Sequence, residues 1–264
     1  NPQAVVTTTP RNVGVLKAIL KNPSSVVTHA PTEANRAYLA ESFLAEVQAR
    51  YGGTRFGRQE LEGVLVEEAE GALWTSAMLE AARVDEAPVF NRVVVAVDPP
   101  VTSMKTSDEC GIVVVGADTR GEPKDWRAVV LEDASVKGAT PEGWARAALA
   151  AMERHGADRL VAEVNQGGDL VERLVRMIDP LVPFRAVHAT RSKMLRAEPV
   201  AALYEQGRVC HVRGLGALEE QLGKMTSVGW QGAGSPDRLD ALVWALTDLM
   251  LTPLHGLRPS VRSL

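Results

Sequence analysis

Cysteine is nearly absent from this chain of 264 residues, which has only Cys110 and Cys210. The two lie far apart and show no metal-ligand spacing, which argues against a cysteine metal site and favours a reducing, cytosolic setting over a secreted one. The histidines also lack the spacing of a zinc site, and we interpret them as structural or surface residues: His29, His155, His188, His211 and His255.

Long apolar runs are missing as well. No stretch approaches the roughly 18 apolar residues of a membrane-spanning helix, and no signal peptide is visible. The net charge is −4, so the chain as a whole is not a basic nucleic-acid binder, and any contact with DNA must come from a local patch. The first residue is Asn1 rather than methionine, and we expect the chain to be a piece of a larger protein.

Apolar residues are plentiful, at 45% of the chain, although aromatic residues make up only 5%. This is enough for one substantial core plus a smaller unit. The polar segment around Asp85 and Pro88 is the best candidate boundary. We predict a small α/β or helical segment over residues 1–86 and a larger α/β domain over residues 87–258.

The larger domain alternates apolar runs with turn residues, and we predict strands at 92–98, 111–117, 127–132, 159–164, 183–188 and 208–212. Short glycine turns separate the first three, which predicts an antiparallel meander. Helices then alternate with strands, and we predict them at 140–156, from 169 onward, at 199–206 and at 237–251, with two more at 13–21 and 32–51 in the first segment. This order predicts a mixed central sheet flanked by helices on both faces, as in the ribonuclease H-like fold.

Three acidic residues stand at strand ends and at a helix start. Asp98 ends the apolar run 93–97, Glu163 ends the run 160–162, and Asp240 lies near the start of the last helix. Aspartate is depleted in strands, and a glutamate in a buried parallel strand is costly unless it is paired or bound to a metal. Each residue alone also fits a plain structural role. Together they predict a cluster of carboxylates at one edge of the sheet.

The last helix carries a second acidic residue, Asp237, one turn before Asp240. Asp240 flanks the apolar stripe of this helix, so we expect it neither in the core nor fully outward, and we expect Asp237 nearer the solvent. Acidic residues are ordinary in a first helical turn, which leaves Asp237 as the weaker candidate.

Such a cluster repels itself unless cations lie within it. Oxygen ligands alone suit Mg²⁺ or Mn²⁺ better than Zn²⁺, and two such ions would serve phosphodiester cleavage. The predicted catalytic and metal-binding residues are therefore Asp98, Glu163, Asp240 and Asp237.

The segment 181–216 holds an excess of basic residues, with six Arg or Lys against two Glu. It predicts either ordinary solvated surface or a rim that binds DNA phosphates beside the carboxylates. Lys193 and Arg196 are the better candidates for DNA binding, with Arg191 close by, because they follow the loop after the predicted strand 183–188.

These residues resemble the nuclease domain of the terminase large subunits of tailed phages and gene transfer agents, the motors that package DNA. The resemblance lies in Val95–Pro99, Ser107–Val113, Ala162–Gly168, Lys193–Val200 and Asp237–Leu242, and upstream in 59–63 and 68–74. It covers most of residues 55–250. Thr7–Pro10 is similar to the coupling motif of the packaging ATPase, so residues 1–86 would be a remnant of the ATPase domain and a linker. No phosphate-binding loop ending in Gly-Lys-Ser/Thr is present, so we expect no ATPase activity.

The resemblance implies an endonuclease that cuts concatemeric double-stranded DNA in the cytoplasm of a bacterial host. The terminase small subunit and the portal protein would be its partners in the full motor. The family's metal-binding carboxylates match Asp98, Glu163 and Asp240. Many relatives have aspartate where this chain has Glu163, and relatives carry an acidic residue or histidine at the position of Asp237.

Two other interpretations stay open. One is a junction resolvase or ribonuclease H-type nuclease of the same fold. The other is a module without catalysis that docks on DNA or the portal, although such a module has no use for carboxylates at inward sites.

Overall fold

A computed structural model of the chain describes residues 4–10, 14–51, 61–65, 71–100, 109–164 and 168–252. Some residues of the segments quoted above lie outside the described residues: 59, 60, 68–70, 107, 108 and 165–167. The end of the predicted larger domain, from residue 253, also lies outside them. The chain divides into two compact units. Unit 1 consists of residues 1–85 and 211–235, and unit 2 of residues 86–210 and 236–264.

The centre of unit 2 is a mixed sheet with the strand order β6-β5-β1-β2-β3-β7. Strands β1 (Arg92–Asp98), β2 (Glu109–Asp118) and β3 (Arg127–Asp133) form the predicted antiparallel meander, with the short helix η2 (Pro123–Asp125) before β3. Strands β5 (Arg159–Glu163) and β6 (Phe184–Val187) extend the sheet in parallel from β1. The edge strand is β7 (Val209–His211), and β4 (Val136–Lys137) pairs with β2. All six predicted strands, and the predicted ribonuclease H-like fold, are confirmed.

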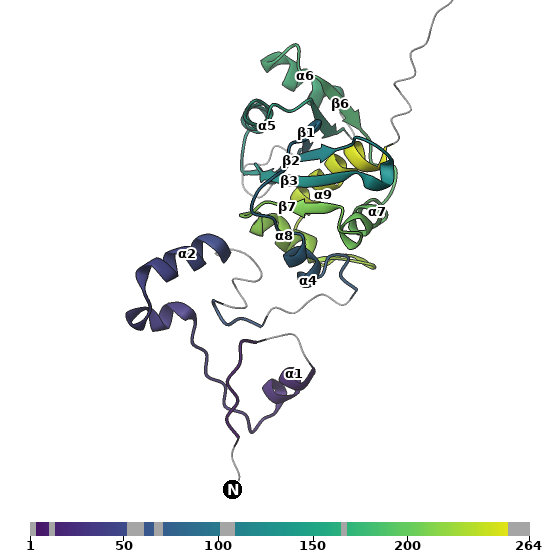
Figure 1. Ribbon diagram of the computed structural model, residues 1–264. Helices are drawn as coiled ribbons and strands as arrows, with labels where there is room; N and C mark the ends of the chain where they lie inside the picture. The colour runs from purple at the N-terminus through teal and green to yellow at the C-terminus, as the bar shows by residue number, and fades with distance from the viewer. Residues whose placement is uncertain are drawn as a thin grey trace, which may run out of the picture. The chain divides into compact units, whose positions relative to one another are not determined.

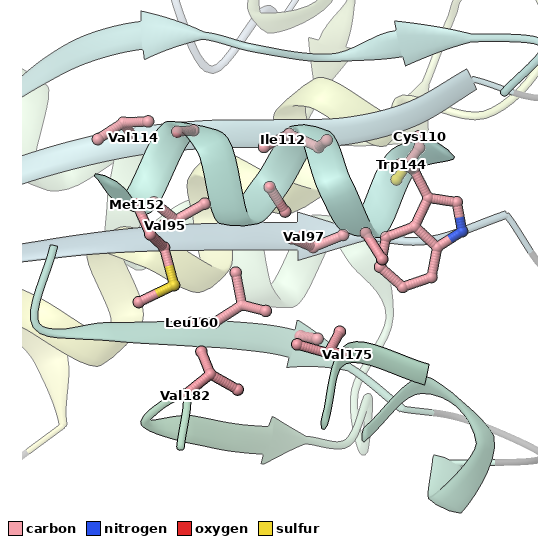
Figure 2. Close-up of a cluster of buried hydrophobic side chains, with 14 residues drawn as sticks. Val95, Val97, Cys110, Ile112, Val114, Trp144, Met152, Leu160, Val175 and Val182 are labelled. Carbon is pink, nitrogen blue, oxygen red and sulfur yellow. The ribbon is translucent and has the colours of Figure 1, made fainter. Parts of the chain in front are cut away.

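Helices α5 (Pro141–His155) and α6 (Gly168–Ile178) cover one face of this sheet. The hydroxyl of Thr140 accepts a hydrogen bond from the Gly143 N–H at the start of α5, and Gly156 ends the helix in a left-handed conformation, as expected for these residue types. Figure 2 shows Trp144 and Met152 of α5 in one cluster with the alternating valines of β1 and the inward side chains of β2. The side chains between this face and the two helices therefore form an apolar core.

Helix α9 (Asp237–Leu246), which continues as the π-helical turn η3 (Thr247–Leu251), covers the other face. In Figure 1 it is drawn in yellow across the central strands. Side chains alternate along β1 and β2, so every second one points away from α5 and toward α9. The side chains on the α9 face are also buried: Val94, Ala96, Val113 and Val115. Helix α7 (Lys193–Glu205) packs against α9. Both faces of the strands are therefore apolar, and polar side chains of the site must come from strand ends and helix starts.

Helix α7 begins six residues before the predicted start at Pro199. The hydroxyl of Ser192 accepts from the Leu195 N–H and caps the helix, and Pro199 lies inside it. The prediction was wrong because proline favours a first helical turn, and the cap at Ser192 was overlooked. The earlier start places Lys193 and Arg196 on the first turns of a helix rather than in a loop.

Unit 1 contains α1 (Gly14–Lys21), η1 (Thr32–Tyr38), α2 (Glu41–Tyr51), α4 (Ser76–Ala81), α8 (Gly216–Leu222) and the β8–β9 hairpin (Met225–Thr226 and Gly229–Trp230). The single helix predicted over 32–51 is wrong, because Leu39 adopts an extended conformation between η1 and α2. Helices α4 and α8 and the hairpin were not predicted. Within the described residues, no helix combines the length and apolar character that crossing a bilayer requires.

Candidate nuclease site

Asp98 and Glu163 end neighbouring parallel strands side by side. The register pairs Val97 of β1 with Ala162 of β5, so the next residue of each strand is one of the two acids. Glu163 is buried, and Asp98 is partly buried at the end of β1. The carboxyl ends of parallel strands meet at one edge of a sheet, which is why residues far apart in the sequence come together here.

Asp240 joins this pair from the first turns of α9. Its side chain is only 1% exposed, so the prediction of a flank between core and solvent was wrong. Helix α9 packs on the sheet along one side and on α7 along another. The contact with α7 covers the side of α9 that carries Asp240. Asp237 is partly buried, as expected, one turn nearer the start of the helix.

Two basic residues of α7 lie against the carboxylates. The ammonium of Lys193 contacts Oδ2 of Asp240. The guanidinium of Arg196 donates from Nη1 to Oε2 of Glu163 and from Nη2 to Oδ1 of Asp240, both at 3.2 Å. The Arg196 side chain is 9% exposed and that of Lys193 is 41% exposed. Of the three residues predicted to bind DNA, Arg191 is exposed, whereas Lys193 and Arg196 are partly buried.

Burial and mutual repulsion dominate the electrostatics of the cluster. Burial raises the pKa of Asp98 well above its ordinary value, and the charges of Asp240 and Glu163 raise it further. Burial also raises the pKa of Asp240, against the opposing effect of Lys193 and Arg196. Ionised carboxylates at this spot are thus costly without nearby positive charge.

Two side chains beside the acids were not predicted to belong to the site. The indole N–H of Trp244 donates to Oε2 of Glu163 at 2.5 Å. Arg238 pairs with Glu109 of β2 and Asp133 of β3, which fixes the start of α9 on the sheet. A signal for Trp244 exists in the sequence, because it follows Asp240 by four residues and helical residues at this spacing are neighbours.

The donor set suits hard divalent cations, because its carboxylate oxygens are buried and repel one another. As the side chains stand, no three His, Cys, Asp or Glu residues in the described parts of the chain are arranged to hold a metal ion. Lys193 and Arg196 supply the compensating charge instead. Metal ions at this spot would therefore compete with Lys193 for Asp240 and share the carboxylates with Arg196.

A mixed sheet in this strand order, with helices on both faces, is the ribonuclease H-like class of α/β domain. The family model described as the terminase RNaseH-like domain matches residues 95–249, more than half of the chain. The chain therefore belongs to the terminase family and contains its nuclease domain.

Several solved structures are similar. The large terminase nuclease of the thermophilic phage G20c is 17% identical at a TM-score of 0.48, and the match covers 67% of this chain and 98% of that chain. It has also been solved with magnesium and with cobalt bound. The human cytomegalovirus terminase nuclease domain is 14% identical at a TM-score of 0.47, with 67% and 96% covered.

The large terminase of bacteriophage HK97 is 12% identical at a TM-score of 0.48. The match covers 86% of this chain and 55% of that chain, so this chain spans about half the length of that protein. No curated protein sequence matches the chain significantly.

Proposed function

We propose that this chain is the metal-dependent endonuclease of a viral DNA-packaging motor, and that it cuts concatemeric double-stranded DNA by two-metal phosphodiester hydrolysis. The observation that carries the proposal is the meeting of Asp98, Glu163 and Asp240 from β1, β5 and α9 within a family of terminase nuclease domains. Buried like charges are maintained at a cost, which favours a catalytic role over a structural one.

Asp98, Glu163 and Asp240 would hold the ions, Mg²⁺ or Mn²⁺, and Asp237 would lie at the edge of the same site. Two bound ions would activate a water for attack and offset charge on the leaving 3′ oxygen. Four acids and the two cations of α7 leave a net charge of about −2, and we therefore expect one ion to bind tightly without DNA and the second with the phosphate.

The residues of α7 would also meet the substrate. Lys193 is half-exposed beside Asp240 and would attract a DNA phosphate toward the carboxylates. The Nε–H of Arg196 is buried and has no hydrogen-bond partner among the described residues. A buried donor without a partner is costly, so an oxygen of the bound phosphate or of a water would be stabilised there. Arg191, which is exposed two residues before Lys193, would contact the DNA backbone further out.

Replacing Asp98 by Asn tests the proposal. The wild-type protein should nick and cut plasmid DNA with Mg²⁺ or Mn²⁺ and lose this activity with EDTA, and Asp98→Asn should be inactive. The variant should also unfold at a temperature no lower than wild type in EDTA, because it removes one charge from a repulsive cluster. Metal-dependent cutting that persists in Asp98→Asn would refute the proposal.

The substrate class is tested with linear duplex, a four-way junction and an RNA–DNA hybrid side by side. Cleavage of the duplex is expected. Preference for the junction would indicate a resolvase, and preference for the hybrid would indicate a ribonuclease H. If none of the three substrates is cleaved with metal present, the chain would be a docking module.

In the full motor we propose the terminase small subunit and the portal protein as partners, in the cytoplasm of the bacterial host. We propose residues 1–86 as the remnant of the ATPase domain and the linker.

A further inference from the structure

We propose that Trp244 and Arg196 are positioning residues that fix the carboxylate of Glu163 for metal binding, an inference that rests on the proposed nuclease function. Trp244 lies on α9 and Arg196 on α7, so neither belongs to the strand that carries Glu163. Both nevertheless direct a donor to the same oxygen of this one carboxylate.

The three side chains form a closed set of contacts. The indole Nε1 of Trp244 lies 2.5 Å from Oε2 of Glu163, and Nη1 of Arg196 lies 3.2 Å from the same oxygen. The guanidinium of Arg196 in turn stacks over the Trp244 ring, 4.7 Å from its centroid. Each of the three therefore touches the other two, and all three are shielded from solvent.

This arrangement restricts the orientation of Glu163 rather than only its charge. A glutamate side chain has more rotamers than an aspartate, and an unsupported one would lose that freedom on each encounter with a metal ion. Two donors that converge on Oε2 hold the carboxylate in one rotamer before any ion arrives. Partners of this kind around a metal ligand commonly decide metal affinity.

Arg196 also sets the separation between two carboxylates. Its Nη1 contacts Glu163 of β5 and its Nη2 contacts Asp240 of α9, both at 3.2 Å. The planar guanidinium holds its two donors at a constant distance, which a lysine ammonium does not do. The face of Trp244 prevents this guanidinium from tilting away. The Trp244 ring thus orients Glu163 twice, directly through its N–H and indirectly through Arg196.

The experiment replaces Trp244 by Phe, which keeps an aromatic ring and removes the N–H. The matched control is Trp126→Phe in the same unit, because Trp126 is similarly buried and its indole N–H donates to the carbonyl of Gly121. Mn²⁺ binding without DNA is measured by isothermal titration, and cleavage is measured as separate kcat and KM values. We expect Trp244→Phe to raise the Mn²⁺ dissociation constant about 10-fold or more. It should lower kcat and leave KM for DNA unchanged, while Trp126→Phe keeps wild-type values for all three.

A second variant, Arg196→Lys, tests the same arrangement if Trp244→Phe does not fold. It keeps the charge and removes the two-armed bridge, and it should also weaken Mn²⁺ binding about 10-fold. Wild-type Mn²⁺ affinity in whichever variant folds would overturn the inference. A wild-type protein that binds no divalent ion and cuts no DNA would instead overturn the proposed function, so the two failures are distinguishable.

Discussion

Gly111 of β2 lies so close to Asp237 that a Cβ atom at position 111 would be 1.9 Å from the Asp237 carbonyl oxygen. Gly111 is also the register partner of Asp98 across the β1–β2 pair. One glycine thus lets the first turn of α9 approach the sheet beside the end of β1. The approach brings Asp237 and Asp240 to the strand-end acids, so the absence of a side chain at position 111 is a requirement of the site.

Replacing Gly111 by Ala should displace the start of α9, because the clash is with backbone and no side-chain rotation relieves it. We expect a loss of about 3 kcal/mol in the free energy of unfolding, the scale of an overpacked core. The matched control is Gly143→Ala in α5, where the nearest atom is the Thr140 hydroxyl at 3.2 Å; it should change stability by less than about 1 kcal/mol. Urea unfolding measures both, and equal effects would remove Gly111 from the account of the site.

Removing Lys193 should make the protein depend on divalent ions for stability. In Lys193→Ala the buried carboxylate of Asp240 loses one of the two basic partners described for it and keeps Arg196. We expect a loss of about 2 kcal/mol in EDTA, less than for a fully buried pair because the Lys193 side chain is 41% exposed. Added Mn²⁺ should raise the melting temperature more in this variant than in wild type.

Arg191→Ala is the control for Lys193→Ala, because Arg191 is exposed two residues earlier. It should leave stability and the Mn²⁺ response unchanged. It should weaken DNA binding evenly across sequences and reduce the salt slope by about 1. If Mn²⁺ stabilises wild type and Lys193→Ala equally, Lys193 does not compete with the metal.

Asp248 should be among the most sensitive acids for stability. This residue of η3 is 1% exposed at its side chain and pairs with Arg92 at 3.2 Å, with Arg159 at 3.6 Å and with Arg185. The arginines begin or lie in β1, β5 and β6, so one carboxylate ties three strands together. Asp248→Ala should cost about 3–5 kcal/mol because it leaves arginines without their partner. Glu142→Ala, which breaks the exposed pair with Arg146, should cost less than about 0.5 kcal/mol. Similar melting temperatures for the two variants would contradict this prediction.

Unit 1 should lose stability in acid through Glu219. Burial alone would raise the pKa of Glu219, but hydrogen bonds from His211 and Arg83, together with their charges, outweigh it and lower the pKa to about 2. Because the pKa is lower in the folded state than the ordinary 4.5, the ionised form stabilises the fold above about pH 4.5. This contribution, about 3 kcal/mol, disappears as pH falls toward 2.

Unfolding free energies measured between pH 6 and pH 2.5 test the role of Glu219. Glu219→Gln should show a shallower decline than wild type over this range. The control Glu33→Gln, at an exposed ion pair with Arg36 in the same unit, should follow the wild-type curve. An unchanged decline in Glu219→Gln would assign the acid sensitivity to other groups.

The sequence was a good guide to the sheet for a physical reason. Strands β1, β2 and β5 are buried on both faces, so they are continuous apolar runs with sharp ends. Those ends are where Asp98 and Glu163 lie, and the register follows from the parallel pairing of β1 with β5. The same runs made the strands and two of the acids predictable together.

The environment of the site was harder to predict because it depends on packing between helices. The helical periodicity of α9 predicted Asp240 at the side of the apolar stripe, between core and solvent. The packing of α7 against α9 buries it. Lys193 and Arg196 were expected to face DNA, whereas their side chains lie on the carboxylates. No role was predicted for Trp244, because an indole in a core shows its N–H partner only in three dimensions. Whether Asp237 binds a metal stays a prediction.

Helix α9 and its extension η3 carry Asp237 and Asp240 at one end and Asp248 at the other. Asp248 pairs with Arg92, the first residue of β1, and Asp98 is the last residue of that strand. The helix and its extension therefore run along the whole length of β1. These acids of the site therefore lie on the helix and strand that form the core of unit 2. Heat inactivation and loss of helical circular dichroism from this unit should coincide in a single step.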